Sequence, residues 1–140
     1  MGYDVHITRA ERWCENRGYA IPREEWHAFV AEDEELEPDP VGGGDFVLWR
    51  GEARFRWWGG NIDTTDPDRR VIDKMLRIAG ALGAVVQGDD GENYTSVDQW
   101  SEDEPGRVKD SWRFTPFGYA LRQTILGRLV ERLRPPSARE

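Results

Sequence analysis

The sequence has few of the residues that carry most recognisable protein chemistry. It contains one cysteine, Cys14, so no internal disulfide can form. It contains two histidines, His6 and His27, and no H-x-E, H-E-x-x-H or C-x-x-C pattern, so a zinc site has no support. The G-x-S-x-G, Walker A and post-strand G-x-G-x-x-G signatures are also missing. These absences predict a protein with no catalytic residue, no cofactor and no metal ion.

The sequence also lacks long apolar runs and a recognisable secretion signal. No segment approaches the ~20 apolar residues that a membrane-spanning helix needs. The N-terminal residues do not resemble a signal peptide. We therefore expect a cytoplasmic protein of bacterial type that makes no membrane contact.

Basic residues are scarce over the first three quarters of the chain. Residues 1–106 hold 11 Lys and Arg against 24 Asp and Glu, a net charge of −13, whereas residues 107–140 hold 8 against 3, a net charge of +5. An acidic surface repels phosphate backbones, so a basic protein is a better partner than nucleic acid. We interpret residues 1–106 as an acidic α+β domain. We interpret residues 107–140 as a basic helical segment that docks on the same domain or on a homodimer mate.

Hydrophobic periodicity predicts the first half of the fold. Residues 3–9 alternate, with Val5 and Ile7 on one face and His6 on the other, which is typical of a half-buried strand. A helix is expected from Ile21-Pro22, followed by a turn-rich acidic connection that reaches residue 44. Residues 45–50 read as a strand. A hairpin follows, with one strand ending at Trp58, a Gly59-Gly60 turn and a return strand.

The second half contains the clearest helix signal. Residues 65–84 show an apolar stripe, a cap at Thr65 or Asp66, a proline at 67 and a terminating Gly83. A short strand is expected at 84–87, and an amphipathic basic helix is expected between Pro116 and Pro135. The predicted fold is a single α+β domain with helices packed on one face of a mostly antiparallel sheet of four to five strands. It has two helices plus the C-terminal basic helix.

The segment GDDGE at residues 88–92 places three carboxylates, Asp89, Asp90 and Glu92, within four positions. Their spacing fails the EF-hand pattern for calcium. Asp90 and Glu92 share a face on an extended chain, whereas Asp89 and Asp90 point apart. The glycines suit a turn. Three interpretations remain: a structural turn, an acidic loop that binds a partner, and a metal or acid–base site.

Trp58 is the second candidate for a contact site. If Phe55 and Trp57 face the core, the alternation of a strand turns Arg56 and Trp58 outward. An exposed tryptophan flanked by arginine has the composition of an interaction hot spot. The alternative is that the C-terminal helix covers this face and buries Trp58.

Two blocks, YDVHITRAERW at 3–13 and DPDRRVIDKMLRIAGALGAVVQGDDGENY at 66–94, support a resemblance. The chain resembles small acidic bacterial proteins of unassigned function that begin with a YDLHITRA-like strand and carry a GA-x-VQGDDGE-Y block. The resemblance covers about residues 1–100. In size, charge and α+β layout such proteins are similar to immunity proteins of bacterial polymorphic toxin systems.

The favoured hypothesis is a non-catalytic intracellular protein-binding module of immunity or antitoxin type. It would neutralise a basic toxin domain through an acidic surface. The expected partner-binding residues are His6, Trp58, Asp63, Asp89, Asp90 and Glu92. One alternative is a metal-dependent enzyme or metal-binding domain that uses His6, Asp63, Asp90 and Glu92. The other is a structural or regulatory homo-oligomer in which the basic helix of one chain meets the acidic body of another.

Overall fold

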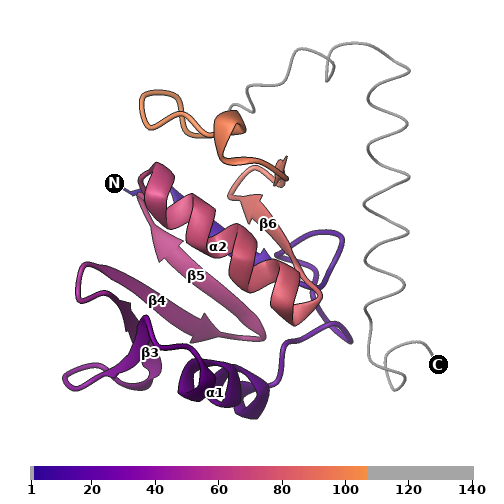
Figure 1. Cartoon of the computed structure of the whole chain (residues 1–140). Helices are drawn as coiled ribbons and strands as arrows, with labels where there is room; N and C mark the ends of the chain where they lie inside the picture. Colours follow the sequence, from indigo (N-terminus) through magenta and orange to yellow (C-terminus); the bar gives the residue numbers. More distant parts are fainter. Residues whose placement is uncertain (1, 107–140) are drawn as a thin grey trace.

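The fold is a seven-stranded antiparallel sheet with two α-helices, seen in a computed structural model that describes residues 2–106 (Figure 1). The strands run across the sheet in the order β2-β3-β4-β5-β1-β6-β7. A short 3-10 helix, η1 (Val97–Gln99), follows the last strand. The other elements are β1 (Asp4–Thr8), α1 (Arg23–Glu32), β2 (Leu36–Asp39), β3 (Gly43–Trp49), β4 (Ala53–Trp58), β5 (Asn61–Thr65), α2 (Arg69–Leu82), β6 (Val85–Gly88) and β7 (Asn93–Tyr94).

The strand register divides the sheet into an apolar face and a polar face. Ile7 lies opposite Ile62 on β5 and Val86 on β6, and Trp57 also lies opposite Ile62. Paired residues point to the same side, so these side chains share the apolar face. His6 lies opposite Asp63 and Gln87, which places all three on the polar face.

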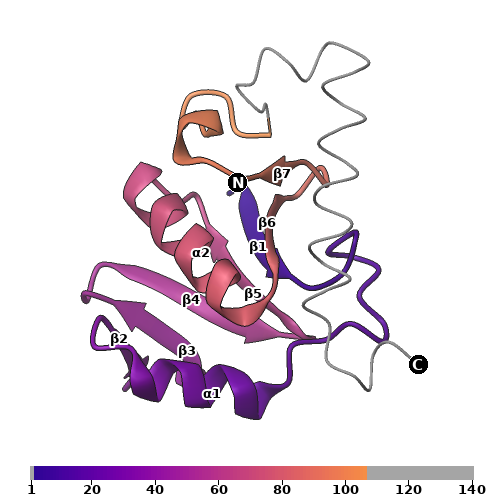
Figure 2. The ribbon, with the colours of Figure 1, turned by 45° about the vertical axis from the view of Figure 1, so that its right-hand side comes forward.

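Both helices cover the apolar face, as the sequence predicted (Figure 2). Helix α2 packs on β1 and β6, and α1 packs on β2 and β3. Arg9 joins the two helices, because its Nη2 donates to Glu25 of α1 and to the Leu82 carbonyl of α2, each at 2.7 Å. The core therefore lies between one helical layer and one sheet layer.

Helix α2 begins later than the sequence suggested. Asp68 is its N-cap, and the carboxylate accepts from the Val71 amide at 2.9 Å. The predicted cap at Thr65 or Asp66 was wrong, because Thr65 still belongs to β5 and Asp66 bonds to Tyr3 through both its amide and its carboxylate. The C-terminal prediction is confirmed: Gly83 adopts a left-handed φ of 64°.

The predicted strand count of four to five was wrong, since the sheet has seven strands. Strand β2 lies within the segment interpreted as a connection, whose acids and Pro38 disfavour a strand. Strand β2 is an edge strand paired only with β3, a position that tolerates proline, and the register shifts next to Pro38. Strand β7, two residues long at the opposite edge, lies where the chain could resume as a strand after GDDG.

The expected basic helix between Pro116 and Pro135 lies outside the described residues, as does its docking. Within residues 2–106, neither helix has the length and apolar character that crossing a bilayer requires.

Candidate functional site

The polar face of the sheet is partly covered by the loop at residues 9–22, which joins β1 to α1. Gln87 anchors this loop: its Oε1 accepts from the Trp13 amide at 2.7 Å and its Nε2 donates to the Glu11 carbonyl at 2.8 Å. The Trp13 indole then stacks on the His6 ring, with centroids 3.9 Å apart and planes 11° apart. As a result His6 is only 3% exposed, although it was expected on the outer face of a half-buried strand.

His6 is held between two carboxylates. Its Nδ1 lies 2.6 Å from Asp63 and its Nε2 lies 2.9 Å from Asp89. Burial lowers the pKa of His6, but the hydrogen bonds and charges of Asp63 and Asp89 outweigh burial and raise it above its usual value. An imidazolium that donates from both nitrogens fits this geometry. Neither nitrogen is then free to act as a base or as a metal ligand.

The other two carboxylates of GDDGE meet at the Tyr3 hydroxyl. This oxygen lies 2.7 Å from each carboxylate oxygen of Glu92 and 3.1 Å from Oδ2 of Asp90. Burial, and then the charge of Asp90, raise the pKa of Glu92. The Tyr3 hydroxyl has one proton, which it can donate to Glu92 or to Asp90, so it is the shared donor of this group. Asp90 and Glu92 therefore both contact the Tyr3 hydroxyl, although residues 89–91 form a turn and not the extended chain on which they were expected to share a face.

Gly88 makes room for this arrangement. A Cβ at that position would lie 1.8 Å from Oε1 of Glu92 and 2.7 Å from the Tyr3 hydroxyl. The first glycine of GDDGE therefore allows the Glu92 carboxylate to approach the backbone closely. The second, Gly91, has a φ of +83°, which glycine adopts without strain.

The structure thus brings most of the predicted site residues together. His6, Asp63 and Asp89 form one hydrogen-bonded group, which we call the His6 cluster together with Trp13. Asp90 and Glu92 form a second group around Tyr3. Trp58 lies apart, at the end of β4.

Trp13 and Tyr3 were not predicted as site residues. Trp13 lies in a polar stretch whose one hint of a role is its aromatic side chain. Tyr3 alternates with Val5 and Ile7, so its position indicated core packing.

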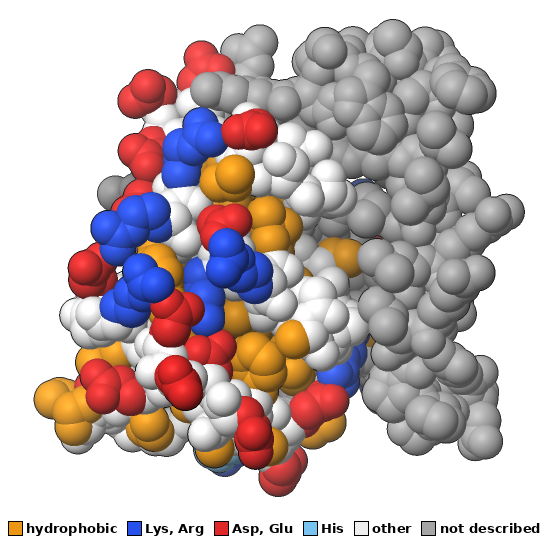
Figure 3. Space-filling view, viewed as in Figure 1, with side chains coloured by type: hydrophobic (Ala, Val, Ile, Leu, Met, Phe, Trp, Pro, Cys, Tyr) orange, Lys and Arg blue, Asp and Glu red, His pale blue; other side chains and the backbone are white. Residues whose placement is uncertain are grey.

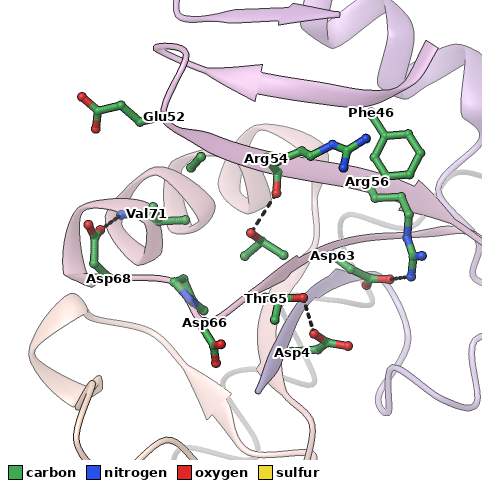
Figure 4. Close-up of a pocket in the computed structure, with 13 residues that line it drawn as sticks. Asp4, Phe46, Glu52, Arg54, Arg56, Asp63, Thr65, Asp66, Asp68 and Val71 are labelled. Carbon is green, nitrogen blue, oxygen red and sulfur yellow. Dashed lines mark hydrogen bonds and ion pairs between the residues drawn. The ribbon is translucent and has the colours of Figure 1, made fainter. Parts of the chain in front are cut away.

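A groove opens beside these groups, where β4 and β5 separate (Figure 4). The two strands pair from Arg56 to Trp58, and one residue beyond, Thr64 Oγ1 donates to the Arg54 carbonyl at 2.9 Å. The groove has a volume of about 600 Å³, and the sequence did not predict it. We call it the acidic groove, because its charged lining comprises two arginines and five carboxylates: Arg54, Arg56, Asp4, Glu52, Asp63, Asp66 and Asp68.

Trp58 is 65% exposed and does not line the acidic groove, but Arg56 connects the two. The Arg56 guanidinium carbon lies 5.2 Å from the centroid of the Trp58 ring. Arg56 also lines the groove and lies 3.7 Å from Asp63. The expectation that Arg56 and Trp58 face outward while Phe55 is buried agrees with this arrangement.

No group of three or more His, Cys, Asp and Glu side chains in the described part of the chain is arranged to hold a metal ion. No protein-family model matches this sequence, no curated protein matches it, and no solved structure matches it. The function is therefore argued from the site alone.

Proposed function

We propose that this protein is a non-catalytic binding module of immunity or antitoxin type, whose partner is a basic protein. The contact surface in this proposal is the acidic groove, its rim and Trp58. Its partner-facing carboxylates include Asp66 and Asp90, which are both exposed.

The observation that carries the proposal is the exposure of Trp58. A tryptophan that remains 65% exposed leaves a large apolar surface in water, and the arginine stacked on it adds a second hot-spot residue. Hot spots of this composition lie at the centre of protein interfaces, where surrounding residues exclude water.

Charge supports a basic partner. The net charge of residues 1–106 is −13, and the acidic groove has more carboxylates than arginines. Complementary charge steers a basic protein towards this face and raises its association rate. His6, Asp63 and Asp89 would act indirectly in this proposal, because their mutual bonds hold the GDDGE segment against β1 and β5.

Capture from extracts of the native host tests the proposal. The immobilised full chain should retain a basic protein at low salt, and Trp58→Ala should lower its affinity at least tenfold, since a hot-spot truncation costs about 2 kcal/mol or more.

Val41→Ala is the matched control. Val41, at 92%, is the other large hydrophobic residue exposed within residues 2–106, and it lies on the connection between β2 and β3. Equal retention of the captured protein by wild type and Trp58→Ala would contradict the proposed contact.

A further inference from the structure

A second cavity, next to the acidic groove, contains much of the positive charge of the described residues. It lies against α2 and the turn after β3 and has a volume of about 420 Å³. We call it the basic cavity. Five of the 11 Lys and Arg of residues 1–106 line it, with two carboxylates: Arg50, Arg69, Arg70, Lys74, Arg77, Glu35 and Asp73. Figure 3 shows the corresponding blue cluster over α2, with red side chains around it.

Three of these cations form one stripe of α2. Arg70, Lys74 and Arg77 are spaced by four and three residues, so they share a face of the helix. Arg50 approaches from the β3–β4 turn. Arg50 and Arg70 lie 5.1 and 5.5 Å from the centroid of the Trp49 ring, which is itself buried. The buried Trp49 ring therefore helps to hold the Arg50 and Arg70 guanidinium groups in place through cation–π contacts.

The field inside this cavity already stabilises an anion. Hydrogen bonds from Lys74, and then from Arg50, lower the pKa of Glu35 to about 2. Lys74 is buried, and its ammonium is held by Asp33 and Glu35 at 2.8 and 2.9 Å. Lys74 therefore keeps its two carboxylate partners and is not available to bind an incoming anion.

The arginines at the rim of the cavity can exchange their carboxylate partners for another anion. Arg70 pairs with Glu52 and Arg77 pairs with Asp73, while their own side chains stay 57% and 74% exposed. Exposed pairs of this kind contribute little to stability. An anion that accepts paired hydrogen bonds from several guanidinium forks can replace them at little cost.

We propose that the basic cavity is a binding site for a small phosphate-class oxyanion. Arg70 and Arg77 bind its oxygens, with Arg50 opposite them and Trp49 beneath. The anion exchanges with the carboxylates that pair with the arginines of the cavity, which are Glu35 with Arg50, Asp98 with Arg69, Glu52 with Arg70 and Asp73 with Arg77. Acidic residues beyond the screening length of about 8 Å oppose it only weakly. The site adjoins the contact surface proposed around Trp58, because Arg70 pairs with Glu52 of the acidic groove.

Calorimetric titration of the full chain tests the site, with inorganic phosphate and glycerol 3-phosphate as probes and sodium chloride at matched ionic strength as the reference. One anion per chain should bind with a dissociation constant below about 1 mM. Tighter binding of the ester identifies an esterified phosphate as the natural ligand, and tighter binding of inorganic phosphate identifies the free ion. No saturable heat with either probe overturns the proposal.

Two double variants that each remove two positive charges show where the anion binds. Arg70→Gln with Arg77→Gln should weaken binding about tenfold or more, because two forks are lost. Arg12→Gln with Arg17→Gln, in the loop at 9–22, removes the same charge from exposed positions outside the cavity and should change binding less than about twofold. An equal loss in both pairs would show nonspecific attraction and overturn the site.

Asp73→Asn gives a gain-of-affinity check that does not depend on weakening the protein. It releases Arg77 from its carboxylate and should tighten phosphate binding by about twofold or more. Unchanged or weaker binding in this variant would contradict the role of Arg77.

Discussion

At the residue scale, the most distinctive feature is His6, a histidine with almost no access to solvent that lies between two carboxylates. His6 has a pKa raised above its usual value of about 6.5, because Asp63 and Asp89 outweigh the effect of burial. Between the unfolded-state pKa of about 6.5 and the higher pKa of the folded state, the folded protein binds a proton that the unfolded chain does not. The stabilisation is therefore complete below pH 6.5 and is lost as pH rises through the folded pKa. Glu92, whose pKa is also raised, acts in the same direction in a window that starts near pH 4.5.

The first prediction concerns the pH dependence of stability. His6→Gln should lower the free energy of unfolding by about 3 kcal/mol at pH 6, because it leaves two carboxylates without their buried cation. It should also flatten the fall in stability above pH 6.5. Urea unfolding from pH 5 to pH 9 measures both effects.

His27→Gln, at an exposed position of α1, is the control for this series and should keep the wild-type profile. An unchanged slope above pH 6.5 in His6→Gln would show that the His6 cluster does not hold the proton.

The second prediction compares two glycines. Gly88→Ala should destabilise the protein by about 2 kcal/mol or more, because its Cβ would meet the Glu92 carboxylate at 1.8 Å. Gly80→Ala should instead stabilise it by about 0.5–1 kcal/mol, because Gly80 lies within α2 and a Cβ there would meet nothing within 4 Å. Thermal unfolding of both variants gives the comparison, and a destabilised Gly80→Ala would contradict the second half.

At the element scale, the predictable parts of the fold are those with local signals. The β4–β5 hairpin follows from the Gly59-Gly60 pair, whose φ angles of 56° and 93° confirm the tight turn. The end of α2 follows from Gly83. Strand β2 was missed because its acids and Pro38 disfavour a strand locally, whereas its position at the sheet edge tolerates them.

The candidate site was harder to predict than the elements that carry it. His6 and Asp89 are 83 residues apart, and they meet because β1 pairs with β6. The sequence identified GDDGE as acidic, but the partners of its carboxylates depend on strand order. The acidic groove depends on the point where β4 and β5 separate, for which a single sequence contains no signal.

The third prediction belongs to the β4–β5 hairpin. Gly60→Ala should destabilise it by about 2 kcal/mol or more, because the new Cβ would lie 2.5 Å from that of Ala20 and φ is positive. Gly59→Asn should cost less than about 1 kcal/mol, since that site is open and asparagine tolerates a left-handed φ. Chemical unfolding distinguishes the two, and equal losses would contradict the tight packing of the turn on the loop at 9–22.

At the scale of the whole molecule, two neighbouring cavities differ in charge: carboxylates predominate in the acidic groove, and Lys and Arg predominate in the basic cavity. Glu52 lines the acidic groove and Arg70 lines the basic cavity, and the two side chains form an ion pair between them. In the two proposals, the acidic groove attracts a basic protein and the basic cavity binds an anion.

The fourth prediction tests the acidic face. Asp66→Asn with Asp90→Asn should slow association with the captured basic partner severalfold and weaken its salt dependence, because both carboxylates are exposed beside Tyr3. Glu24→Gln with Glu32→Gln on α1 is the control of equal charge. Neutralising Asp89 is a poorer test, because it would also unpair His6. Stopped-flow rates that match in both pairs would contradict steering by this face.

The most direct test of the central claim is hydroxyl-radical footprinting of the chain, free and bound to its captured partner. Trp58 is exposed in the free chain, and the buried Trp26 and Trp100 serve as internal references. The account predicts that oxidation of Trp58 falls severalfold on binding while that of Val41 stays unchanged. Oxidation of Trp58 at the same rate in both states would contradict the proposed contact surface.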